Sequence, residues 1–394
     1  MRETAPLWAY FDIRPSNVDK KTKEGERPVR LVNYTDVYYN QKITSDLELM
    51  KATASDEHIE RFGVVPGDII ITKDSEAPDD IGIPALITQS SQDMVCAYHL
   101  ALLRPEAKIA DPRFLYRVLE SDYAKQHWLV NSYGVTRYSI LTGAISRLRV
   151  PAYDLATQKH IADYLDRETS EIDAMITKMD ELAGHLVMRR QAMFVNVLRR
   201  HFDAGTVPIW SFLAPIKDQG HANEEVLSVY RDYGVIPKSS RDDNINRTPE
   251  DLSSYQLVLP GDVVINKMKA WQGSMGVSEH RGIVSPDYQV ARPIRAVVPR
   301  YLHAVLRSQI MIPQYRVRST GVRPAQWRLY WNDFADLEIP LPSEAVQKRI
   351  ADHLDEGTSR IDNMLAKVAE LKSLLLERRS ALVTDVVTGR KGIA

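Results

Sequence analysis

The chain contains one segment twice. Residues 158–190 align without gaps on residues 347–379 at a constant offset of 189, and 18 of the 33 positions are identical. Chance does not produce identity of this extent, so the two segments are copies of one duplicated unit. Any fold of this chain must therefore contain the same long element in two places.

The duplication extends into the sequence before each copy. A Pro-Gly-Asp turn, three apolar residues and a lysine occur within residues 66–73 and again within 260–267. Gly134-Val135-Thr136-Arg137 is matched by Gly321-Val322-Arg323, and the offsets drift between 187 and 196, as short loop insertions would cause. We predict a first mixed domain at residues 1–153, a first helix at 154–201, a second mixed domain at 202–342 and a second helix at 343–394.

Both copies of the repeated segment are predicted to be long helices. Asp154 and Ser343 precede them as N-cap residues. No proline follows until Pro208 in the first copy, and none follows in the second. About 45 residues at about 1.5 Å each give a rod of roughly 65 Å, which is longer than an ordinary globular helix.

Apolar residues in both helices recur with a period of seven, which favours helices that pair along one side. One seam consists of Leu165, Ile172, Met179, Leu186 and Met193 with their repeats Leu354, Ile361, Val368, Leu375 and Leu382, and the companion positions are Ile161, Met175, Leu182, Ile350, Met364 and Leu371. The alternative is that each helix packs only on its own domain. Because the second domain begins where the first helix ends, we expect an antiparallel pair with one mixed domain at each end.

The remaining regions lack helical periodicity and contain short β-rich runs bounded by turn residues. We predict strands at residues 64–65, 69–71, 94–98, 257–259 and 263–265, and short helices at residues 112–123 and 299–309. The expected fold class is α/β (α+β). It comprises two similar mixed α/β domains, each with a twisted and mainly antiparallel sheet, separated by two long antiparallel coiled-coil helices in a pseudo-two-fold repeat.

The total charge is balanced, but basic residues are concentrated in one region. The chain has 51 Lys and Arg against 52 Asp and Glu, a net charge of −1. Between Asp287 and Asp333 there is no acidic residue, yet aromatic residues and eight arginines occur there. The arginines are Arg292, Arg295, Arg300, Arg307, Arg316, Arg318, Arg323 and Arg328. This pattern indicates contact with nucleic acid. The alternative for any one arginine is a helix cap or an ion pair with an acid elsewhere.

Loops at equivalent positions of the two domains supply the candidate DNA contacts. Lys73 and Lys267 each end a strand before a polar loop, and Gly134 and Gly321 precede arginines where the backbone needs positive φ or close approach to a ligand. The candidate contacts are Lys73, Arg137, Tyr138, Lys267, Lys269, Trp271, Arg316, Arg318, Arg323 and Trp327. For each, an ordinary solvated surface residue is the alternative.

Several classes of protein are disfavoured. A single cysteine, Cys96, excludes a disulfide framework and a Cys-rich zinc site. We find no signal peptide and no apolar run of about 20 residues, so we expect a cytoplasmic protein without a membrane span. No phosphate loop, dinucleotide fingerprint, Pro-Pro dipeptide or paired-histidine zinc motif occurs. We expect no catalytic, cofactor-binding or metal-binding residues in this chain.

Together these features resemble the specificity subunits of type I DNA restriction-modification systems. The resemblance covers nearly the whole chain and rests on the duplicated Gln-Lys-x-Ile-Ala-Asp-x-Leu-Asp segments, the Val-Pro and Ile-Pro pairs before them, the Gly-Val-(Thr)-Arg elements and residues 266–271. It implies that each mixed domain is a target-recognition domain for one half of a split site in double-stranded DNA, contacted by Arg137 and Arg323. Because only the second domain has the Lys-Met-Lys-Ala-Trp loop, the site would be asymmetric.

The resemblance also implies partners. The helices would fix the gap between half-sites and dock two modification subunits, which bring S-adenosylmethionine for adenine methylation. Separate restriction subunits would bring ATP and Mg for translocation and cleavage, and this chain would be a non-catalytic recognition subunit. Two alternatives stay open: a stand-alone DNA methyltransferase or nuclease, and a coiled-coil DNA-binding scaffold without restriction partners.

Overall fold

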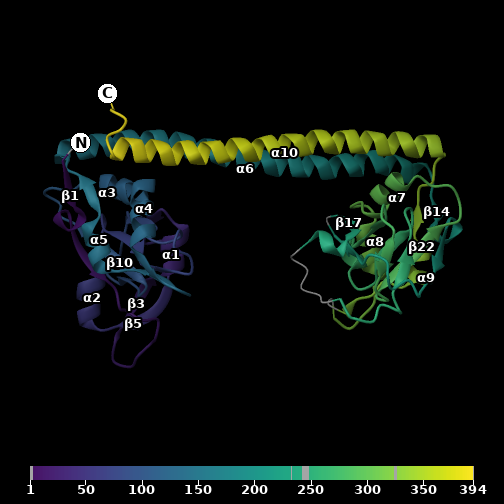
Figure 1. Ribbon diagram of the computed structural model, residues 1–394, viewed down its shortest axis with the longest axis horizontal. Helices are drawn as coiled ribbons and strands as arrows, with labels where there is room; N and C mark the ends of the chain where they lie inside the picture. The colour runs from purple at the N-terminus through teal and green to yellow at the C-terminus, as the bar shows by residue number, and fades with distance from the viewer. Residues whose placement is uncertain (1–2, 232, 242–247, 324–325, 394) are drawn as a thin grey trace. The chain divides into compact units, whose positions relative to one another are not determined.

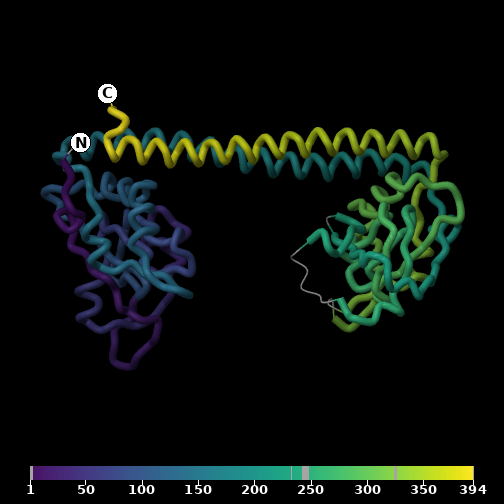
Figure 2. The backbone as a smooth tube through the Cα atoms, viewed as in Figure 1, coloured from purple at the N-terminus to yellow at the C-terminus, as the bar shows by residue number. Residues whose placement is uncertain are grey.

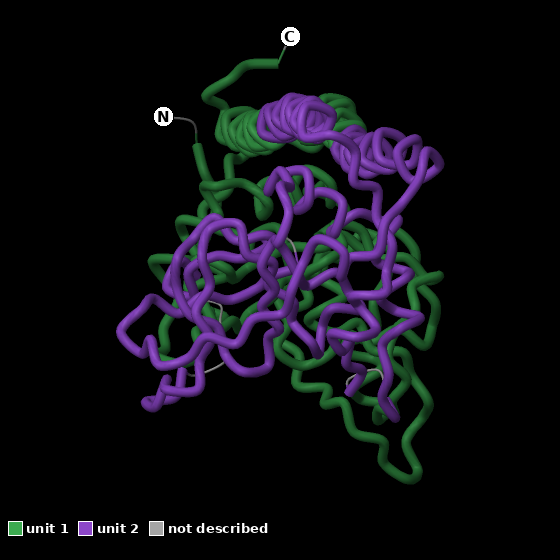
Figure 3. Tube along the Cα trace, turned by 90° about the vertical axis from the view of Figure 1, so that its right-hand side faces the viewer, with its two compact units in different colours: residues 1–179, 369–394 green, residues 180–368 purple. Residues whose placement is uncertain are grey.

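The computed structural model describes residues 3–231, 233–241, 248–323 and 326–393 (Figure 1). It divides into two compact units, coloured separately in Figure 3. Unit 1 comprises residues 1–179 and 369–394, and unit 2 comprises residues 180–368. Each unit therefore holds one mixed domain together with one half of each long helix.

The domain of unit 1 is built on a five-stranded sheet with the order β2-β10-β6-β8-β4, in which β4 and β8 run parallel and the other pairs are antiparallel. Smaller sheets have the orders β5-β3-β9, β11-β12-β7 and β1-β13. The elements are β1 Thr4–Pro6, η1 Leu7–Ala9, β2 Phe11–Pro15, β3 Arg27–Val32, α1 Tyr34–Tyr39, β4 Lys42–Ile43, β5 Met50–Ala54, α2 Asp56–Phe62, β6 Ile69–Thr72, β7 Asp74–Ser75, β8 Pro84–Ile87, β9 Met94–Cys96, β10 Leu100–Pro105, α3 Pro112–Glu120, α4 Asp122–Asn131, β11 Ser132–Gly134, β12 Tyr138–Ile140, α5 Thr142–Arg147 and β13 Arg149–Pro151.

The domain of unit 2 is built on a four-stranded antiparallel sheet with the order β15-β22-β19-β20. Pairs β14-β23, β16-β17 and β18-β21 complete the strands of its described residues. The elements are β14 Val207–Pro208, η2 Ile209–Ser211, β15 Leu213–Ile216, β16 Leu227–Tyr230, β17 Gly234–Pro237, η3 Lys238–Ser240, β18 Gln256–Val258, β19 Val263–Asn266, η4 Ala270–Gln272, β20 Met275–Val277, β21 Gly282–Val284, β22 Tyr288–Pro293, α7 Pro299–Leu306, α8 Ile312–Arg318, α9 Trp331–Ala335 and β23 Glu338–Ile339.

The two main sheets repeat each other strand for strand, since β2-β10-β6-β8 corresponds to β15-β22-β19-β20. The central strand of each is buried on both faces. In β6, Ile69 and Ile71 belong to one core cluster and Ile70 to another, as the two-residue period of a strand requires. Strand β19 divides its residues between two clusters in the same way. The prediction of mixed domains with mainly antiparallel sheets is confirmed.

The Pro-Gly-Asp turn before each central strand is structural. The carboxylate of Asp68 accepts a hydrogen bond from the amide of Val65 at 2.8 Å and pairs with both ends of the Arg104 guanidinium. Asp262 pairs with Arg292 in the same way. The predicted strand at residues 64–65 is wrong, because this carboxylate takes the amide that a strand would use for its ladder.

The predicted helix at residues 112–123 is also wrong in extent. Helix α3 ends at Glu120, and Ser121 adopts an extended conformation before α4 begins. The hydroxyl of Ser121 accepts a hydrogen bond from the amide of Ala124 at 3.4 Å, which caps the second helix.

The repeated segments form the long helices α6 (Leu155–Ala204) and α10 (Glu344–Val387). Asp154 is the N-cap of α6, because its Oδ1 accepts a hydrogen bond from the amide of Thr157 at 2.7 Å. Within the described residues the hydroxyl of Ser343 makes no such bond. Its carbonyl accepts from the amide of Gln347 at 3.0 Å instead.

In each unit, half of α6 lies against half of α10 and runs in the opposite direction (Figure 2). Unit 1 has an ion pair between Arg379 and Asp173 at 2.8 Å, and unit 2 has one between Arg190 and Asp362 at 3.1 Å. The residues of the second pair are the repeats of those in the first. The prediction of antiparallel pairing is confirmed.

The helical seam is narrower than the sequence predicted. Within each unit the first seam is largely buried, including Leu165 in unit 1 and Leu354 in unit 2. Several companion residues are instead 43–51% exposed. These are Met175 and Leu371 in unit 1, and Leu182 and Met364 in unit 2. The helix pair therefore carries an apolar face that its own unit does not cover.

A buried glutamine fixes the first turn of each long helix to the preceding domain. Gln158 accepts from the amide of Asp111 and donates to the carbonyl of Tyr153, both at 2.9 Å. Its repeat, Gln347, accepts from the amide of Val298 at 2.8 Å and donates to a carbonyl just before the helix. These contacts set the position of the helix against its domain.

Candidate nucleic-acid interface

The sequence predicts DNA contacts from the strand-end lysines and from the Gly-Val-(Thr)-Arg loops. In both units these two segments lie next to each other. In unit 1 the amide of Ile140, on the strand that returns from the Gly-Val-Thr-Arg loop, donates to the carbonyl of Lys73 at 2.8 Å. In unit 2 the amide of Leu329 donates to the carbonyl of Lys267 at 2.9 Å. In each domain one main-chain hydrogen bond therefore links the strand-end lysine to the arginine loop, and we call this link the joint.

The loop of unit 1 is a tight hairpin between β11 and β12. Gly134 has φ +144°, and a Cβ added there would lie 1.9 Å from the carbonyl oxygen of Arg137, so only glycine fits. Val135 at the tip is 89% exposed, and Arg137 is exposed beside it. Tyr138 is half-buried and pairs with Ser75 of β7. The hairpin presents its arginine to solvent.

A buried carboxylate organises the base of this hairpin. Asp74 accepts hydrogen bonds from Lys73 Nζ at 2.8 Å and Ser139 Oγ at 2.5 Å, and it contacts His99 Nδ1 at 2.6 Å. Burial alone would raise the pKa of Asp74, but the hydrogen bonds from Lys73, Ser139 and His99 hold this pKa below its ordinary value. The ammonium of Lys73 is thus held by an ionised carboxylate at the base of the hairpin.

The loop of unit 2 closes in a similar way. A Cβ added to Gly321 would lie 2.6 Å from the carbonyl oxygen of Gln326, so a side chain does not fit there. Thr320 pairs with Arg328 across the turn. Val322 is 93% exposed, and Arg323 is exposed next to it.

A second loop of unit 2 packs against this turn. Trp271 and Trp327 lie edge to face with ring centroids 5.5 Å apart, and Trp271 Nε1 donates to the carbonyl of Met268 at 3.2 Å. Lys267 Nζ donates to the carbonyl of Pro286 at 2.7 Å, whereas Lys269 is exposed. The structure therefore brings together candidate residues that are about sixty positions apart in the chain.

The eight arginines of the basic run divide into two groups. Arg292 pairs with Asp262, Arg300 with Asp352 and Asp355, and Arg307 donates to main-chain carbonyls. The other five side chains are exposed and make no hydrogen bond or ion pair within the described residues. They are Arg295, Arg316, Arg318, Arg323 and Arg328. Three arginines are therefore engaged within the protein, which was the alternative to a nucleic-acid contact. The other five are exposed to solvent.

Helix α8, which ends at Arg318, packs against the short turn η4 that carries Trp271. Arg316 and Arg318 lie in its last turn. The valine between them is 85% exposed. The predicted residues of unit 2 thus form one connected surface: α8, the 267–273 loop and the 320–329 turn.

Other kinds of site find no support in the described part of the chain. No group of three or more His, Cys, Asp or Glu side chains that could hold a metal ion occurs there. Cys96 is buried, and burial raises the pKa of its thiol. None of the described helices combines the length and apolar character needed to cross a membrane.

Residues 19–182, which include the Lys73 joint and the start of α6, match the type I restriction modification DNA specificity domain. This segment belongs to that family. The chain is also similar to the type I restriction enzyme StySPI specificity subunit of Salmonella potsdam, with 23% identity over 203 residues. That similarity covers 47% of this chain and 42% of the relative, so the match spans less than half of the relative's length.

Solved structures of specificity subunits share this fold. The HsdS subunit from Thermoanaerobacter tengcongensis is 16% identical with a TM-score of 0.57, over 99% of this chain and 97% of that one. A chain from a structure concerned with complex assembly and conformational transition of the type I R-M system is 16% identical with a TM-score of 0.66, over 98% of this chain and 97% of that one. At this identity the likeness concerns the fold alone.

The sequence reasoning missed an aromatic cluster on the specificity domain. Tyr34 and Tyr38 of α1 stack with ring centroids 5.7 Å apart, and the adjacent Tyr39 is 77% exposed. Burial raises the pKa of Tyr34, while a hydrogen bond with Ser75 and the charge of Arg137 act in the opposite direction. The cluster therefore adjoins the arginine hairpin. Aromatic residues at i and i+4 of a short helix were the available signal.

Unit 2 also has an aromatic cluster. The guanidinium of Arg241 lies 5.3 Å from the ring centroid of Tyr230 and 4.7 Å from that of Tyr233. Tyr230 ends strand β16, and Tyr233 is 60% exposed. Both units therefore carry exposed tyrosines, but only in unit 1 do they adjoin the arginine hairpin.

Proposed function

We propose that this chain is the DNA specificity subunit of a type I restriction-modification complex. In this proposal the domains of residues 1–153 and 202–342 each read one half of a bipartite, asymmetric site in double-stranded DNA. The observation that carries the proposal is the joint shared by Lys73 and Ile140 in unit 1 and by Lys267 and Leu329 in unit 2, which presents an exposed arginine loop in each unit. The family of residues 19–182 supports it.

The exposed arginines are the groups that would meet DNA first. Arg137 lies on a hairpin whose Gly134 leaves no room for a side chain, and Arg323 follows Gly321, which leaves none either. A guanidinium can donate two hydrogen bonds to guanine or to a phosphate. Lys269, Arg316 and Arg318 would add contacts in unit 2 alone, which makes the two half-sites different.

The tryptophan pair of unit 2 provides an apolar wall beside those charges. Trp271 and Trp327 are both partly exposed, and their edge-to-face contact limits the motion of both rings. Such a wall suits contact with a thymine methyl group or a sugar. Unit 1 has stacked tyrosines next to its loop instead, so we propose that the two domains recognise different bases.

We propose that catalysis belongs to partner subunits and that the complex works in the cytoplasm. Two modification subunits would supply S-adenosylmethionine and adenine methylation, and restriction subunits would supply ATP and Mg. The apolar face around Met175 and Leu371 in unit 1, and around Leu182 and Met364 in unit 2, supports docking of helical partners on the long helices.

The domain assignment is tested by exchanging one domain. The chain is expressed with its modification subunit, and methylated adenines are mapped across the genome. Replacing residues 1–153 by the corresponding domain of another specificity subunit is expected to change one half of the methylated site and leave the other half intact. Replacing residues 202–342 is the matched control and should change only the other half. Methylation by this chain without partners, or an unchanged site in both chimaeras, would contradict the proposal.

A further inference from the structure

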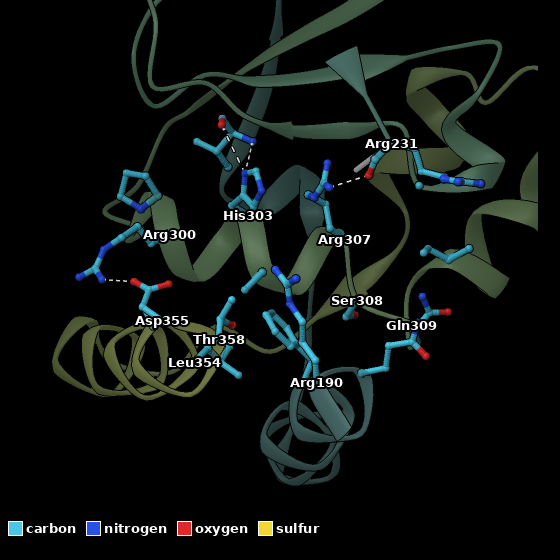
Figure 4. Close-up of a pocket in the computed structure, with 18 of the residues that line it drawn as sticks. Arg190, Arg231, Arg300, His303, Arg307, Ser308, Gln309, Leu354, Asp355 and Thr358 are labelled. Atoms are coloured by element: carbon cyan, nitrogen blue, oxygen red, sulfur yellow. Dashed lines mark hydrogen bonds and ion pairs between the residues drawn. The ribbon is translucent and has the colours of Figure 1, made fainter. Parts of the chain in front are cut away.

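Unit 2 contains a cavity of about 950 Å³ between the helix pair and α7 (Figure 4). Arg190 of α6 and Thr358 of α10 project into it from the long helices, and α7 contributes His303 on the opposite wall (Figure 4). Arg307 follows α7 and also lines the cavity. The cavity is open to solvent and much larger than one side chain.

The corresponding place in unit 1 is filled by an ionic cluster. Glu120 of α3 accepts from Arg379 Nη1 at 2.5 Å and from Arg117 Nη1 at 2.8 Å. Arg117 Nη2 also donates to the hydroxyl of Thr169 and to Asp166, both at 2.9 Å. The side chains of Arg117, Arg379 and Glu120 are 8%, 11% and 14% exposed, so the cluster is buried.

Comparison of the two repeats shows which residues differ between the cavity of unit 2 and the ionic cluster of unit 1. On the long helices, Thr358 and Arg190 of unit 2 are the same residue types as their repeats in unit 1. On the domain side, three charged positions of unit 1 differ. They are Arg117 and Glu120 of α3 and Asp122 of α4, which become Ala304, Arg307 and Gln309. The formal charge of these three positions changes from −1 to +1.

Two buried hydroxyls in unit 2 have no hydrogen-bond partner among the described residues. Thr169 accepts from Arg117 in unit 1, whereas Ala304 stands at the repeat position of Arg117, and the hydroxyl of Thr358, the repeat of Thr169, has no partner there. The hydroxyl of Ser308, a residue only 3% exposed, also has none there. Buried polar groups normally have a partner, and a group bound in the cavity could supply one to both hydroxyls.

Arg190 has also lost the acid that its repeat binds. Arg379 lies between Asp173 and Glu120, whereas within the described residues the ion-pair partner of Arg190 is Asp362 alone, at 3.1 Å and about half-exposed. The position of Glu120 is taken by Arg307. A carboxylate in the cavity would therefore restore the contact to Arg190 that unit 1 makes within its own chain.

We propose that this cavity binds the carboxylate side chain of an acidic segment of a partner protein, which occupies the place that Glu120 fills in unit 1. The volume accommodates a short peptide rather than a lone side chain. Asp355 and Glu279 also line the cavity, and the charge of Asp355 is paired with Arg300. Because unit 1 fills its own copy, the chain offers one such site. The cavity borders the proposed DNA-contact surface, since Gln272, Gly273 and Ile312 line it, but none of the candidate DNA-contact residues does.

The test measures the binding of a fluorescein-labelled peptide with three consecutive glutamates to the full chain, by fluorescence anisotropy at low salt. The double variant Ala304→Arg/Arg307→Glu rebuilds the cluster of unit 1 inside unit 2. It is expected to weaken peptide binding at least about tenfold, since it removes a charge-assisted contact and fills the space. Arg190→Gln is a milder second variant with the same expected direction, and Arg318→Gln, outside the cavity, should bind as the unchanged chain does.

Each alternative gives a distinct result. Undiminished binding in both cavity variants, when circular dichroism shows that they are folded, would overturn the proposal. An equal loss in Arg318→Gln would assign the binding to the general basic surface. Glutarate that binds as tightly as the peptide would indicate a free small dicarboxylate as the occupant. Loss of duplex DNA binding in Arg190→Gln, with peptide binding retained, would assign the cavity to nucleic acid.

Discussion

The amide of Ile140 donates a hydrogen bond to the carbonyl oxygen of Lys73 at 2.8 Å, and this bond joins the end of the central strand to the base of an exposed arginine hairpin. Leu329 and Lys267 repeat the bond in unit 2 at 2.9 Å. Since both partners are main-chain groups, the joint is independent of the side chains that each loop presents. The two loops can differ in sequence while their bases keep the same geometry.

Replacing Arg323 with alanine is expected to weaken DNA binding. If Arg323 reads a base, discrimination at one position of the site should fall by about 1–3 kcal/mol. If it contacts a phosphate, affinity should fall uniformly for all sequences, and the slope of log affinity against log salt should decrease by about one. Binding titrations against a set of single-base variants of the site, at several salt concentrations, distinguish these results. No change in any of them would remove Arg323 from the interface.

Gly134→Ala is expected to distort the hairpin of unit 1. The added Cβ would meet the carbonyl of Arg137 at 1.9 Å, and φ of +144° is strained for alanine by about 1–3 kcal/mol. DNA binding by this domain should weaken, while the exposed hairpin tip limits the effect on overall stability. Gly184→Ala is the matched control on α6, where no atom lies within 4 Å of the added Cβ. It should stabilise the helix by about 1 kcal/mol and leave DNA binding unchanged. Equal effects of the two changes would contradict the hairpin argument.

Glu120→Gln is expected to destabilise unit 1 by about 3 kcal/mol, because it leaves the buried guanidinium groups of Arg117 and Arg379 without their shared carboxylate. Amide hydrogen exchange in α3 measures the effect locally, and exchange should become faster there. Glu168→Gln, which breaks a more exposed ion pair with Arg167, should change stability by less than about 1 kcal/mol. Unchanged protection of α3 in Glu120→Gln would show that the cluster contributes little.

The stability of unit 2 should fall in mild acid because of His303. Burial and, to a smaller extent, the charge of Arg307 lower the pKa of His303 to about 4, against the opposing effects of the hydrogen bond with the main chain of Val277 and the charge of Asp355. Between the ordinary pKa of 6.5 and about 4 the unfolded chain binds the proton more readily, so stability falls as pH decreases through this window. The total is about 3 kcal/mol. Urea unfolding at several pH values should show a shallower dependence for His303→Gln, and an identical dependence would contradict this assignment.

The elements predicted best from the sequence were those that the duplication marks. The long helices, their antiparallel pairing and the central strands at Ile69–Thr72 and Val263–Asn266 follow from periodicity and from the repeat itself. The errors arose where a side chain competes for a main-chain group. Asp68 takes the amide of Val65, and Ser121 divides one predicted helix into two.

The candidate interface was only partly accessible from the sequence. The basic run indicated nucleic acid, but only the fold shows that Arg292 and Arg300 are engaged by carboxylates that are distant in the chain. The contact between Trp271 and Trp327 depends on a loop and a turn meeting in space, which no local pattern encodes. Likewise, the aligned repeats show that Arg307 stands where unit 1 has Glu120. Only the structure shows that a cavity lies at this position in unit 2.

Gln158 and Gln347 bind only main-chain amides and carbonyls of the domain that precedes each helix. A peptide group offers the same donor and acceptor whatever side chain it carries. A different domain with the same backbone path would therefore form the same hydrogen bonds with these glutamines. An exchanged domain would therefore keep the glutamine contacts whatever its side chains are, but it would keep the ion pairs to Asp166 of α6 and to Asp352 and Asp355 of α10 only with an arginine at the positions of Arg117 and Arg300.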